Sequence, residues 1–325
     1  MKTDTGVDRA DLTDAVAEAY GLKIARIRFV PKGEASHAYT VYRTGGDRYF
    51  LKLYRDGRMS AISAATIDFD TQAARYLHEE LEIENIAYPI VTAGNNLYSR
   101  YRGNPIVLLN FIKGETVAPR ALMESEAREV ARTIATIHSG ASALRTPGTP
   151  VEDFCLSFAA DLRNGLSELS EPTLMHDPFT KRLVAMLAPH AEHLLTALRR
   201  TEYAGRGLAE HGTSDFVLCH ADPHTDNLMV DRNGSIHLID WNGSRFAPKE
   251  LDLMFFLRNQ WGAFSNAYAS IAGPDEIRPE VWAFYATKRR LEDITDWLLR
   301  ILNENTDVEQ HNHDLLGLGG IWTDG

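Results

Sequence analysis

The stretch from Val217 to Trp241 constrains this chain more than any other. It reads VLCHADPHTDNLMVDRNGSIHLIDW. The apolar runs at 216–218 and 236–239 predict two short buried strands, and Asp231–Gly234 predicts a turn. A polar loop lies between the first strand and the turn, and Asp240 stands where the second strand ends. We therefore expect Asp222 and Asn227 of the loop to lie close to Asp240.

The spacing of these three residues matches the phosphoryl-transfer machinery of the kinase fold. Asn227 follows Asp222 by five positions, and Asp240 follows Asn227 by thirteen. In the kinase template, an Asp with an Asn five positions later forms the catalytic loop, and a metal-binding Asp ends a following strand. Magnesium prefers oxygen ligands, which Asn227 and Asp240 supply. Asp222 would orient or accept the proton of an attacking hydroxyl, as a general base does.

Other residues of the stretch identify a branch of this superfamily. Ala221 replaces the Arg usual in protein kinases, and Trp241-Asn242 replaces Phe-Gly after the metal-binding Asp. With His220, His224 and the Asp-Trp pair, the chain resembles the aminoglycoside phosphotransferase family, whose loop reads His-Gly-Asp-x-His-x-x-Asn. The match continues through Ala247–Phe255 and is most similar to the members that phosphorylate spectinomycin.

The resemblance implies an α+β fold with the two lobes of a protein kinase. Residues 1–112 would form a nucleotide-binding lobe with an antiparallel sheet and a helix. Residues 113–325 would form a mainly helical lobe with the catalytic loop and the acceptor site. The expected strands are 24–30, 38–43, 48–53, 86–90, 96–101 and 105–111, and the expected helices are 9–21, 67–81, 125–139, 154–169, 179–200 and 279–303. The tail after residue 304 is rich in Gly and polar residues, and we expect it to be poorly ordered.

The resemblance also implies a nucleotide site in the first lobe. Lys52 alternates with large apolar residues and would reach the α- and β-phosphates. Alone, it would more often be a solvated edge lysine. Asp70 or Asp68 of the following helix would pair with it, although an exposed Asp in a first helical turn is an equally good interpretation. The remaining expected nucleotide contacts are Gly33 and Ser36 of the phosphate-covering turn and the backbone groups of Asn110 and Ile112 in the hinge.

A further group of residues would support the loop or bind the acceptor. His220 and His224 are expected to hydrogen-bond backbone, and Asp252 to hold the catalytic loop without reacting. His138 is expected to be a surface or cap residue. Trp241 fits core packing or an acceptor wall equally well. The candidate acceptor contacts are Asp226, Glu292 and Asp293, for which a solvated acidic face is at least as good an interpretation.

The composition of the chain narrows the partners and the cellular location that we expect. The net charge of −11 argues against nucleic acid as a partner and permits a cationic one. No apolar run reaches the length of about 20 residues that a membrane span needs, and residues 1–12 have no apolar signal-peptide core. Cys155 and Cys219 cannot form a disulfide framework. A cytoplasmic location is the expectation.

The predicted function is transfer of the γ-phosphate of ATP or GTP, with Mg²⁺, to a hydroxyl of a small molecule. The preferred acceptor is an aminoglycoside or aminocyclitol antibiotic such as spectinomycin. The alternatives are a metabolic kinase for homoserine, choline, methylthioribose or an amino sugar, a bacterial stress-type protein kinase, and an inactive binding module. The intact Asp222, Asn227, Asp240 and Lys52 argue against the last of these.

Overall fold

The structure is a computed structural model that describes residues 4, 6–32, 36–55, 58–257, 260–273, 276–304 and 308–323. Its contacts divide the chain into two compact units. The first contains Thr3–Val151 and Asp215–Glu276, and the second contains Glu152–Ser214 and Ile277–Gly325. The boundary predicted at residue 112, between a nucleotide-binding lobe and a lobe with the catalytic loop and the acceptor site, stays a prediction. Within the described part of the chain, no helix has the length and apolar character needed to cross a membrane.

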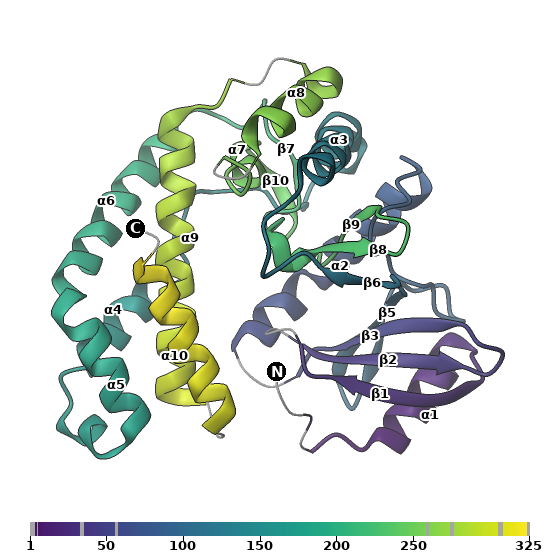
Figure 1. Cartoon of the computed structure of the whole chain (residues 1–325), viewed down its shortest axis with the longest axis horizontal. Coiled ribbons are helices and arrows are strands. Elements are labelled where there is room, and N and C mark those ends of the chain that lie inside the picture. Colours follow the sequence, from purple (N-terminus) through teal and green to yellow (C-terminus); the bar gives the residue numbers. More distant parts are fainter. Residues whose placement is uncertain are drawn as a thin grey trace. The chain divides into compact units, whose positions relative to one another are not determined.

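A five-stranded antiparallel sheet forms the N-terminal part of the first unit, in the order β1-β2-β3-β5-β4. Figure 1 labels β1, β2, β3 and β5 of this sheet. Alternation along β3 places Leu51 on the face that forms a core with Leu12 of α1. Lys52 therefore lies on the opposite face, beside its cross-strand partner Val107. The elements are α1 (Arg9–Tyr20), β1 (Ile24–Val30), β2 (His37–Arg43), β3 (Arg48–Leu53), α2 (Arg58–Glu79), β4 (Ser99–Tyr101) and β5 (Asn104–Asn110).

Two smaller antiparallel sheets complete the strands of the first unit, in the orders β6-β8-β9 and β10-β7. Apolar partners such as Leu228 and Leu238 face each other between β8 and β9 and are buried. The loop with Asp222 and Asn227 joins β7 to β8, and Asp240 follows β9. The elements are β6 (Gly114–Thr116), α3 (Glu124–Gly140), β7 (Val217–Cys219), β8 (Leu228–Asp231), β9 (Ile236–Leu238), β10 (Arg245–Ala247), α7 (Glu250–Leu253) and α8 (Trp261–Ala272).

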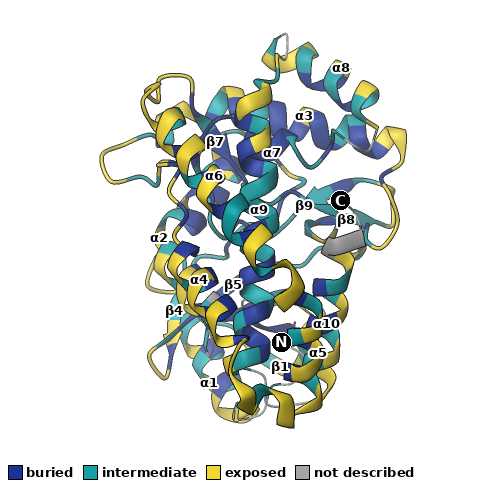
Figure 2. Cartoon of the chain, turned by 90° about the vertical axis from the view of Figure 1, so that its left-hand side faces the viewer, coloured by how far each residue is buried: buried dark blue, intermediate teal, exposed yellow. Residues whose placement is uncertain are grey.

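The second unit is built from helices that bury one face each, as the banding of α4 and α5 in Figure 2 shows. Helix α9 contacts α4, α6 and α10. A buried ion pair joins Arg300, just after α9, to Asp314 of α10. The elements are α4 (Ala159–Glu168), α5 (Pro178–Leu187), α6 (Ala191–Ala209), α9 (Pro279–Leu299), a π-helical turn (Arg300–Glu304) and α10 (Val308–Thr323).

The predicted fold class is confirmed, and several element predictions are wrong in detail. The strand expected at 96–101 begins only at Ser99, and the helix expected at 154–169 begins only at Ala159. Helix α2 begins well before residue 67. The segment 86–90 forms only isolated bridges, from Ile86 and Pro89. The single helix expected at 179–200 is broken around Pro189, which cannot donate the helical hydrogen bond. The tail expected to be poorly ordered contains the helix α10.

Candidate active site

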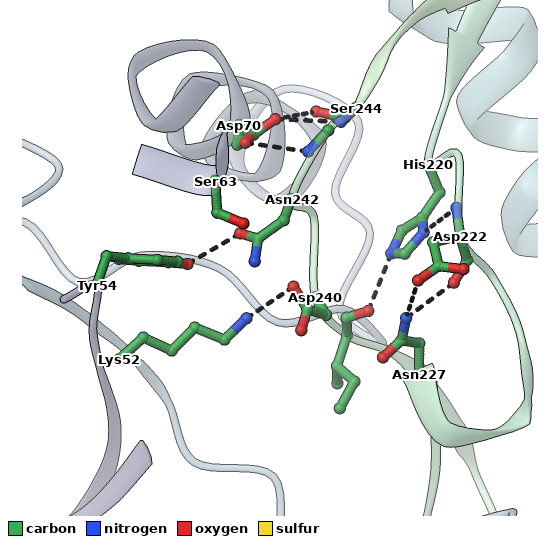
Figure 3. Close-up of polar contacts among 12 residues, drawn as sticks. Lys52, Tyr54, Ser63, Asp70, His220, Asp222, Asn227, Asp240, Asn242 and Ser244 are labelled. Carbon is green, nitrogen blue, oxygen red and sulfur yellow. Dashed lines mark hydrogen bonds and ion pairs between the residues drawn. The ribbon is translucent and has the colours of Figure 1, made fainter. Parts of the chain in front are cut away.

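The loop between β7 and β8 brings the three predicted oxygen-bearing side chains together (Figure 3). The side-chain amide of Asn227 donates to the Asp222 carbonyl at 2.9 Å and to its carboxylate Oδ2 at 3.1 Å. The backbone N–H of Ile239 donates to the Asn227 carbonyl at 2.9 Å, which places Asp240 one residue beyond this bond. Hydrogen bonds therefore hold the loop with Asp222 and Asn227 close to the strand end that carries Asp240, as the spacing predicts.

His220 joins the same two segments through its ring. Its Nε2 lies 2.9 Å from the Ile239 carbonyl, and its Nδ1 accepts from the Asp222 N–H at 3.3 Å. A carbonyl only accepts, so Nε2 carries the proton and the ring is neutral. Burial lowers the pKa of His220, which keeps it neutral at pH 7. The expectation that His220 hydrogen-bonds backbone agrees with these contacts.

His224 contacts the predicted catalytic carboxylate directly. Its Nδ1 accepts from the Asp226 backbone N–H at 3.2 Å. Nε2 lies 3.2 Å from Asp222 Oδ2. His224 therefore bonds backbone, as expected, and in addition helps to fix the carboxylate orientation of Asp222.

Asp252 holds the start of the loop from beneath. Its carboxylate accepts from the backbone N–H groups of His220 and Ala221 at 2.9 and 2.7 Å, and from His138 Nε2 at 3.1 Å. The other ring nitrogen of His138 lies 2.8 Å from the Tyr268 hydroxyl. The expectation of a surface or cap role for His138 is therefore wrong. One signal was present in the sequence, since His138 follows the buried Ile134 by four residues and shares its helix face.

Ala221 adopts a left-handed backbone conformation, with φ of 75°. The family pattern has Gly at this position, and Gly takes this conformation without the clash of a Cβ. We expect Ala221→Gly to raise the unfolding free energy by about 0.5–1 kcal/mol, since the relieved strain exceeds the entropic cost of Gly. Urea unfolding measures this change. A matched control is Ala160→Gly on the exposed face of α4, which should lose up to about 1 kcal/mol. Equal losses in both variants would contradict the expectation.

Lys52 forms its ion pair with Asp240, at 2.7 Å between Nζ and Oδ1 (Figure 3). Burial alone would lower the pKa of Lys52, but Asp240 and Tyr54 raise it above its ordinary value, so the ammonium stays charged. The expected pairing with Asp70 or Asp68 is wrong. Asp70 accepts hydrogen bonds from Thr66, Gly243 and Ser244 instead. Asp68 is exposed and lies beside the Tyr98 hydroxyl.

Burial raises the pKa of Asp70 to about 6, partly offset by its hydrogen bonds. Its unfolded value is about 3.9, so the native state binds this proton more tightly and loses stability as pH rises from about 4 to 6. The difference in unfolding free energy between wild type and Asp70→Asn should therefore fall by about 2–3 kcal/mol between pH 4 and 7. Urea unfolding across this range measures it. A flat difference for Asp70→Asn would contradict the raised pKa.

The hinge residues have unequal freedom to bind a base. The Asn110 N–H donates to the Tyr88 carbonyl at 3.1 Å, and its side chain bonds Tyr88 and Ile86 at 2.8 and 3.2 Å. The N–H of Asn110, one of the backbone groups expected to bind the base, therefore already donates within the protein. The Ile112 N–H donates to no acceptor in the described part of the chain. A cavity of about 370 Å³ is lined by Asn110, Phe111, Ile112, Lys113, Asp231, Arg232, Asn233 and His237.

The phosphate-covering turn is described only at its end. Ser36 is buried immediately before β2. Gly33 lies outside the described residues.

Asn227 and Asp240 fit a magnesium ion by the chemistry of their unused atoms. The Asn227 amide nitrogen is committed to Asp222, so its Oδ1 faces away from those bonds. One carboxylate oxygen of Asp240 pairs with Lys52, and the other contacts no donor in the described chain. Two protein oxygens suit Mg²⁺, which keeps waters and phosphate oxygens as its other ligands.

A second cluster with metal-ligating atoms lies beneath the loop and is better explained as structural. Ligand atoms of His138, Cys219 and Asp252 lie within 4.8 Å of one another, and all three residues are buried. The Asp252 oxygens already accept from three N–H donors. The Cys219 thiol contacts the carbonyls of Ala247 and Pro248 at 3.7 and 3.6 Å.

The candidate acceptor residues differ in their surroundings. Trp241 is buried and packs edge-on against His220, with ring centroids 4.7 Å apart, which favours the core interpretation. Asp226 is exposed beside His224 in the first unit. In the second unit, Asp293 pairs with Arg289 at 3.0 Å, whereas Glu292 has no ion-pair partner among the residues that the structure describes.

Several solved structures share the architecture of this chain. A spectinomycin phosphotransferase, APH(9)-Ia, solved with ADP and spectinomycin, has a TM-score of 0.75 at 21% identity and covers 97% of this chain and 95% of its own. An aminoglycoside phosphotransferase from Alicyclobacillus acidocaldarius has a TM-score of 0.60 at 17% identity, covering 95% and 92%. The choline kinase LicA from Streptococcus pneumoniae has a TM-score of 0.56 at 16% identity, covering 95% and 98%. The sequence matches no curated protein.

These likenesses show the fold, and the family follows from the sequence itself. The model of the phosphotransferase enzyme family matches residues 26–293, which is most of the chain. The expectation of a phosphotransferase that acts on an alcohol group agrees with this match. The chain therefore belongs to the phosphotransferase enzyme family.

Proposed function

We propose that this enzyme transfers the γ-phosphate of a nucleoside triphosphate to a hydroxyl of a small cationic acceptor, and that an aminocyclitol or aminoglycoside is the acceptor class. The observation that carries the proposal is the joint placement of Asp222, Asn227 and Asp240 with Lys52 paired to Asp240. Phosphoryl transfer depends on positioning and charge neutralisation more than on covalent chemistry, and these groups supply both.

Each side chain has one task in this reaction. Asp222 orients the acceptor hydroxyl and takes its proton, while Asn227 and His224 hold the carboxylate in place. Lys52 offsets the negative charge of the phosphates. Asn227 and Asp240 would hold Mg²⁺, which neutralises charge on the phosphate oxygens when bound. The Ile112 N–H and the Asn110 carbonyl would bind the base edge.

The acceptor class rests on charge and on likeness. The chain carries a net charge of −11, which favours a cationic ligand over an anionic one. A structure with spectinomycin bound covers nearly the whole chain.

The test is a transfer assay with γ-labelled ATP or GTP, Mg²⁺ and a panel of acceptors. Spectinomycin, kanamycin, choline, homoserine and methylthioribose separate the antibiotic class from the metabolic one. Labelling of an aminocyclitol or aminoglycoside supports the proposal, and labelling of choline or another metabolite alone replaces the acceptor class. The choline kinase likeness is the observation that favours the metabolic alternative.

The inactive-module alternative makes a different prediction. A ligand that binds only the folded state raises the melting temperature. ATP with Mg²⁺ should therefore stabilise the protein, and Mg²⁺ should increase the effect of the nucleotide. Labelling of the enzyme itself or of lysate proteins, without labelling of small acceptors, would instead support a protein kinase.

A further inference from the structure

We propose that Asp70 is a positioning residue: it hydrogen-bonds the turn Trp241–Ser244, which follows Asp240, and thereby sets the orientation of Asp240. The inference rests on the metal-binding role of Asp240 in the proposed function. It assigns to the carboxylate of α2 a task different from the lysine pairing that the sequence suggests.

Both carboxylate oxygens of Asp70 accept hydrogen bonds from this turn (Figure 3). Oδ1 accepts from the Ser244 backbone N–H at 3.1 Å and from its hydroxyl at 2.9 Å. Oδ2 accepts from the Gly243 N–H at 3.2 Å and from the Thr66 hydroxyl at 2.6 Å. Asp70 and Ser244 are both buried, so water does not compete for these bonds.

The turn that Asp70 binds begins directly after Asp240. The Ser244 N–H also donates to the Trp241 carbonyl at 3.2 Å, which closes the turn, and Gly243 has φ of 84°. Asp240 itself has φ of 66°, a left-handed conformation that is uncommon for residues other than Gly, although Asp adopts it more often than most. Such a conformation persists when its surroundings hold it, and the hydrogen bonds from Gly243 and Ser244 to Asp70 fix the turn that follows it.

A second attachment comes from the residue that directly follows β3, the strand of Lys52. The Tyr54 hydroxyl donates to Asn242 Oδ1 at 2.9 Å (Figure 3). Burial raises the pKa of Tyr54 to about 12, so the hydroxyl keeps its proton and remains a donor. The turn is thus held at Asn242 by Tyr54, which follows β3 directly, and at Gly243 and Ser244 by Asp70 of α2, while Lys52 of β3 holds Asp240 itself. Loss of Asp70 removes the hold on Gly243 and Ser244 and frees Asp240 to rotate away from its ion-binding orientation.

The first experiment measures how well the turn is protected from hydrogen exchange, with no nucleotide or metal present. Hydrogen exchange of a peptide covering residues 241–246 is measured in wild type, Asp70→Asn, Ser244→Ala and the control Asp68→Asn. Asn replaces one of the two acceptor oxygens by an amide donor, so the N–H group of either Gly243 or Ser244 loses its acceptor, and we expect exchange about tenfold faster in Asp70→Asn. Ser244→Ala loses one bond only and should show a smaller increase. Exchange that is the same in Asp70→Asn and Asp68→Asn overturns the proposal.

The second experiment tests the proposed Mg²⁺ site by measuring ADP binding at increasing concentrations of Mg²⁺. We expect Asp70→Asn to raise the half-saturating Mg²⁺ concentration about tenfold, with ADP affinity in the absence of Mg²⁺ unchanged. The double variant with Ser244→Ala should be no weaker than Asp70→Asn alone, because both changes remove the same contact. A melting temperature lowered without any change in half-saturation would show a purely structural residue and overturn the proposal.

The two experiments separate this inference from the proposed function. If wild type shows no Mg²⁺ dependence of ADP binding, the proposed function has failed at Asp240, and the positioning role falls with it. If wild type shows that dependence and Asp70→Asn matches it, only the role of Asp70 is overturned. Should Asp70→Asn fold poorly, Ser244→Ala carries both tests, with exchange and half-saturation moving together as the supporting result.

Discussion

Asp222→Asn should lower kcat for phosphoryl transfer by about 10²–10⁴-fold, the usual contribution of a positioned general base. The variant is isosteric, and its side-chain oxygen can still accept from the Asn227 amide, which lies 3.1 Å from Oδ2 in the wild type. The loop should therefore keep its shape. The change removes the negative charge that orients the acceptor hydroxyl, so the loss should appear in kcat while KM for the nucleotide stays within about threefold.

The measurement is a steady-state assay on the acceptor identified by the panel, with ADP binding and the melting temperature as controls. Unchanged ADP affinity in the presence of Mg²⁺ shows that the phosphate site is intact. Near-wild-type turnover would show that Asp222 neither orients nor deprotonates the acceptor. A parallel loss of ADP affinity would mean that the substitution has disturbed the loop, and His224→Asn would then test the carboxylate orientation separately.

The grouping of Asp222, Asn227 and Asp240 was predictable because all three lie in one short segment. A loop, a hairpin and fixed spacings leave little freedom, and the Ile239–Asn227 bond of the hairpin completes the geometry. Lys52 was predictable from its alternation in β3 for the same reason. Local sequence determines which face of a strand a residue occupies.

The partner of Lys52 was not predictable, because it depends on how α2 lies against β3 and the turn after β9. Asp68 and Asp70 are separated by one residue on the same helix, yet one is exposed and the other buried. His138 shows the same limit, since its partners Tyr268 and Asp252 lie 130 and 114 residues away. Contacts of this kind come from tertiary packing and leave little trace in local patterns.

Helix α10 shows tertiary packing overriding composition. Gly317 lowers the intrinsic helix propensity of the tail. A Cβ at Gly317 would approach the Trp297 ring to 2.5 Å, so glycine there permits close packing of α10 on α9. Leu315 and Leu318 are buried in the same helix, and Asp314 pairs with Arg300. Burial of these groups stabilises a helix that the sequence pattern alone argues against.

Asp240→Asn should abolish measurable transfer, by a thousandfold or more, and should also destabilise the protein. The activity loss follows from the loss of a charged oxygen ligand, because metal coordination stabilises the transition state by several kcal/mol. The stability loss has another origin. The Lys52 ammonium is buried and would be left beside a neutral amide in place of the carboxylate at 2.7 Å. Since the Asp240 side chain is 32% exposed, we expect a cost of about 1–3 kcal/mol, less than for a fully buried pair.

The double variant Lys52→Met/Asp240→Asn separates these two effects. Met has a similar apolar stem and suits the face that Lys52 shares with Val107, so it removes the unpaired charge without opening a cavity. Stability in urea should therefore recover by about 1–2 kcal/mol relative to Asp240→Asn, while transfer stays absent. A double variant less stable than Asp240→Asn would show that Lys52 does not depend on Asp240 for its place in the fold. Retained Mg²⁺-dependent ADP binding in Asp240→Asn would show that the metal ion is held elsewhere.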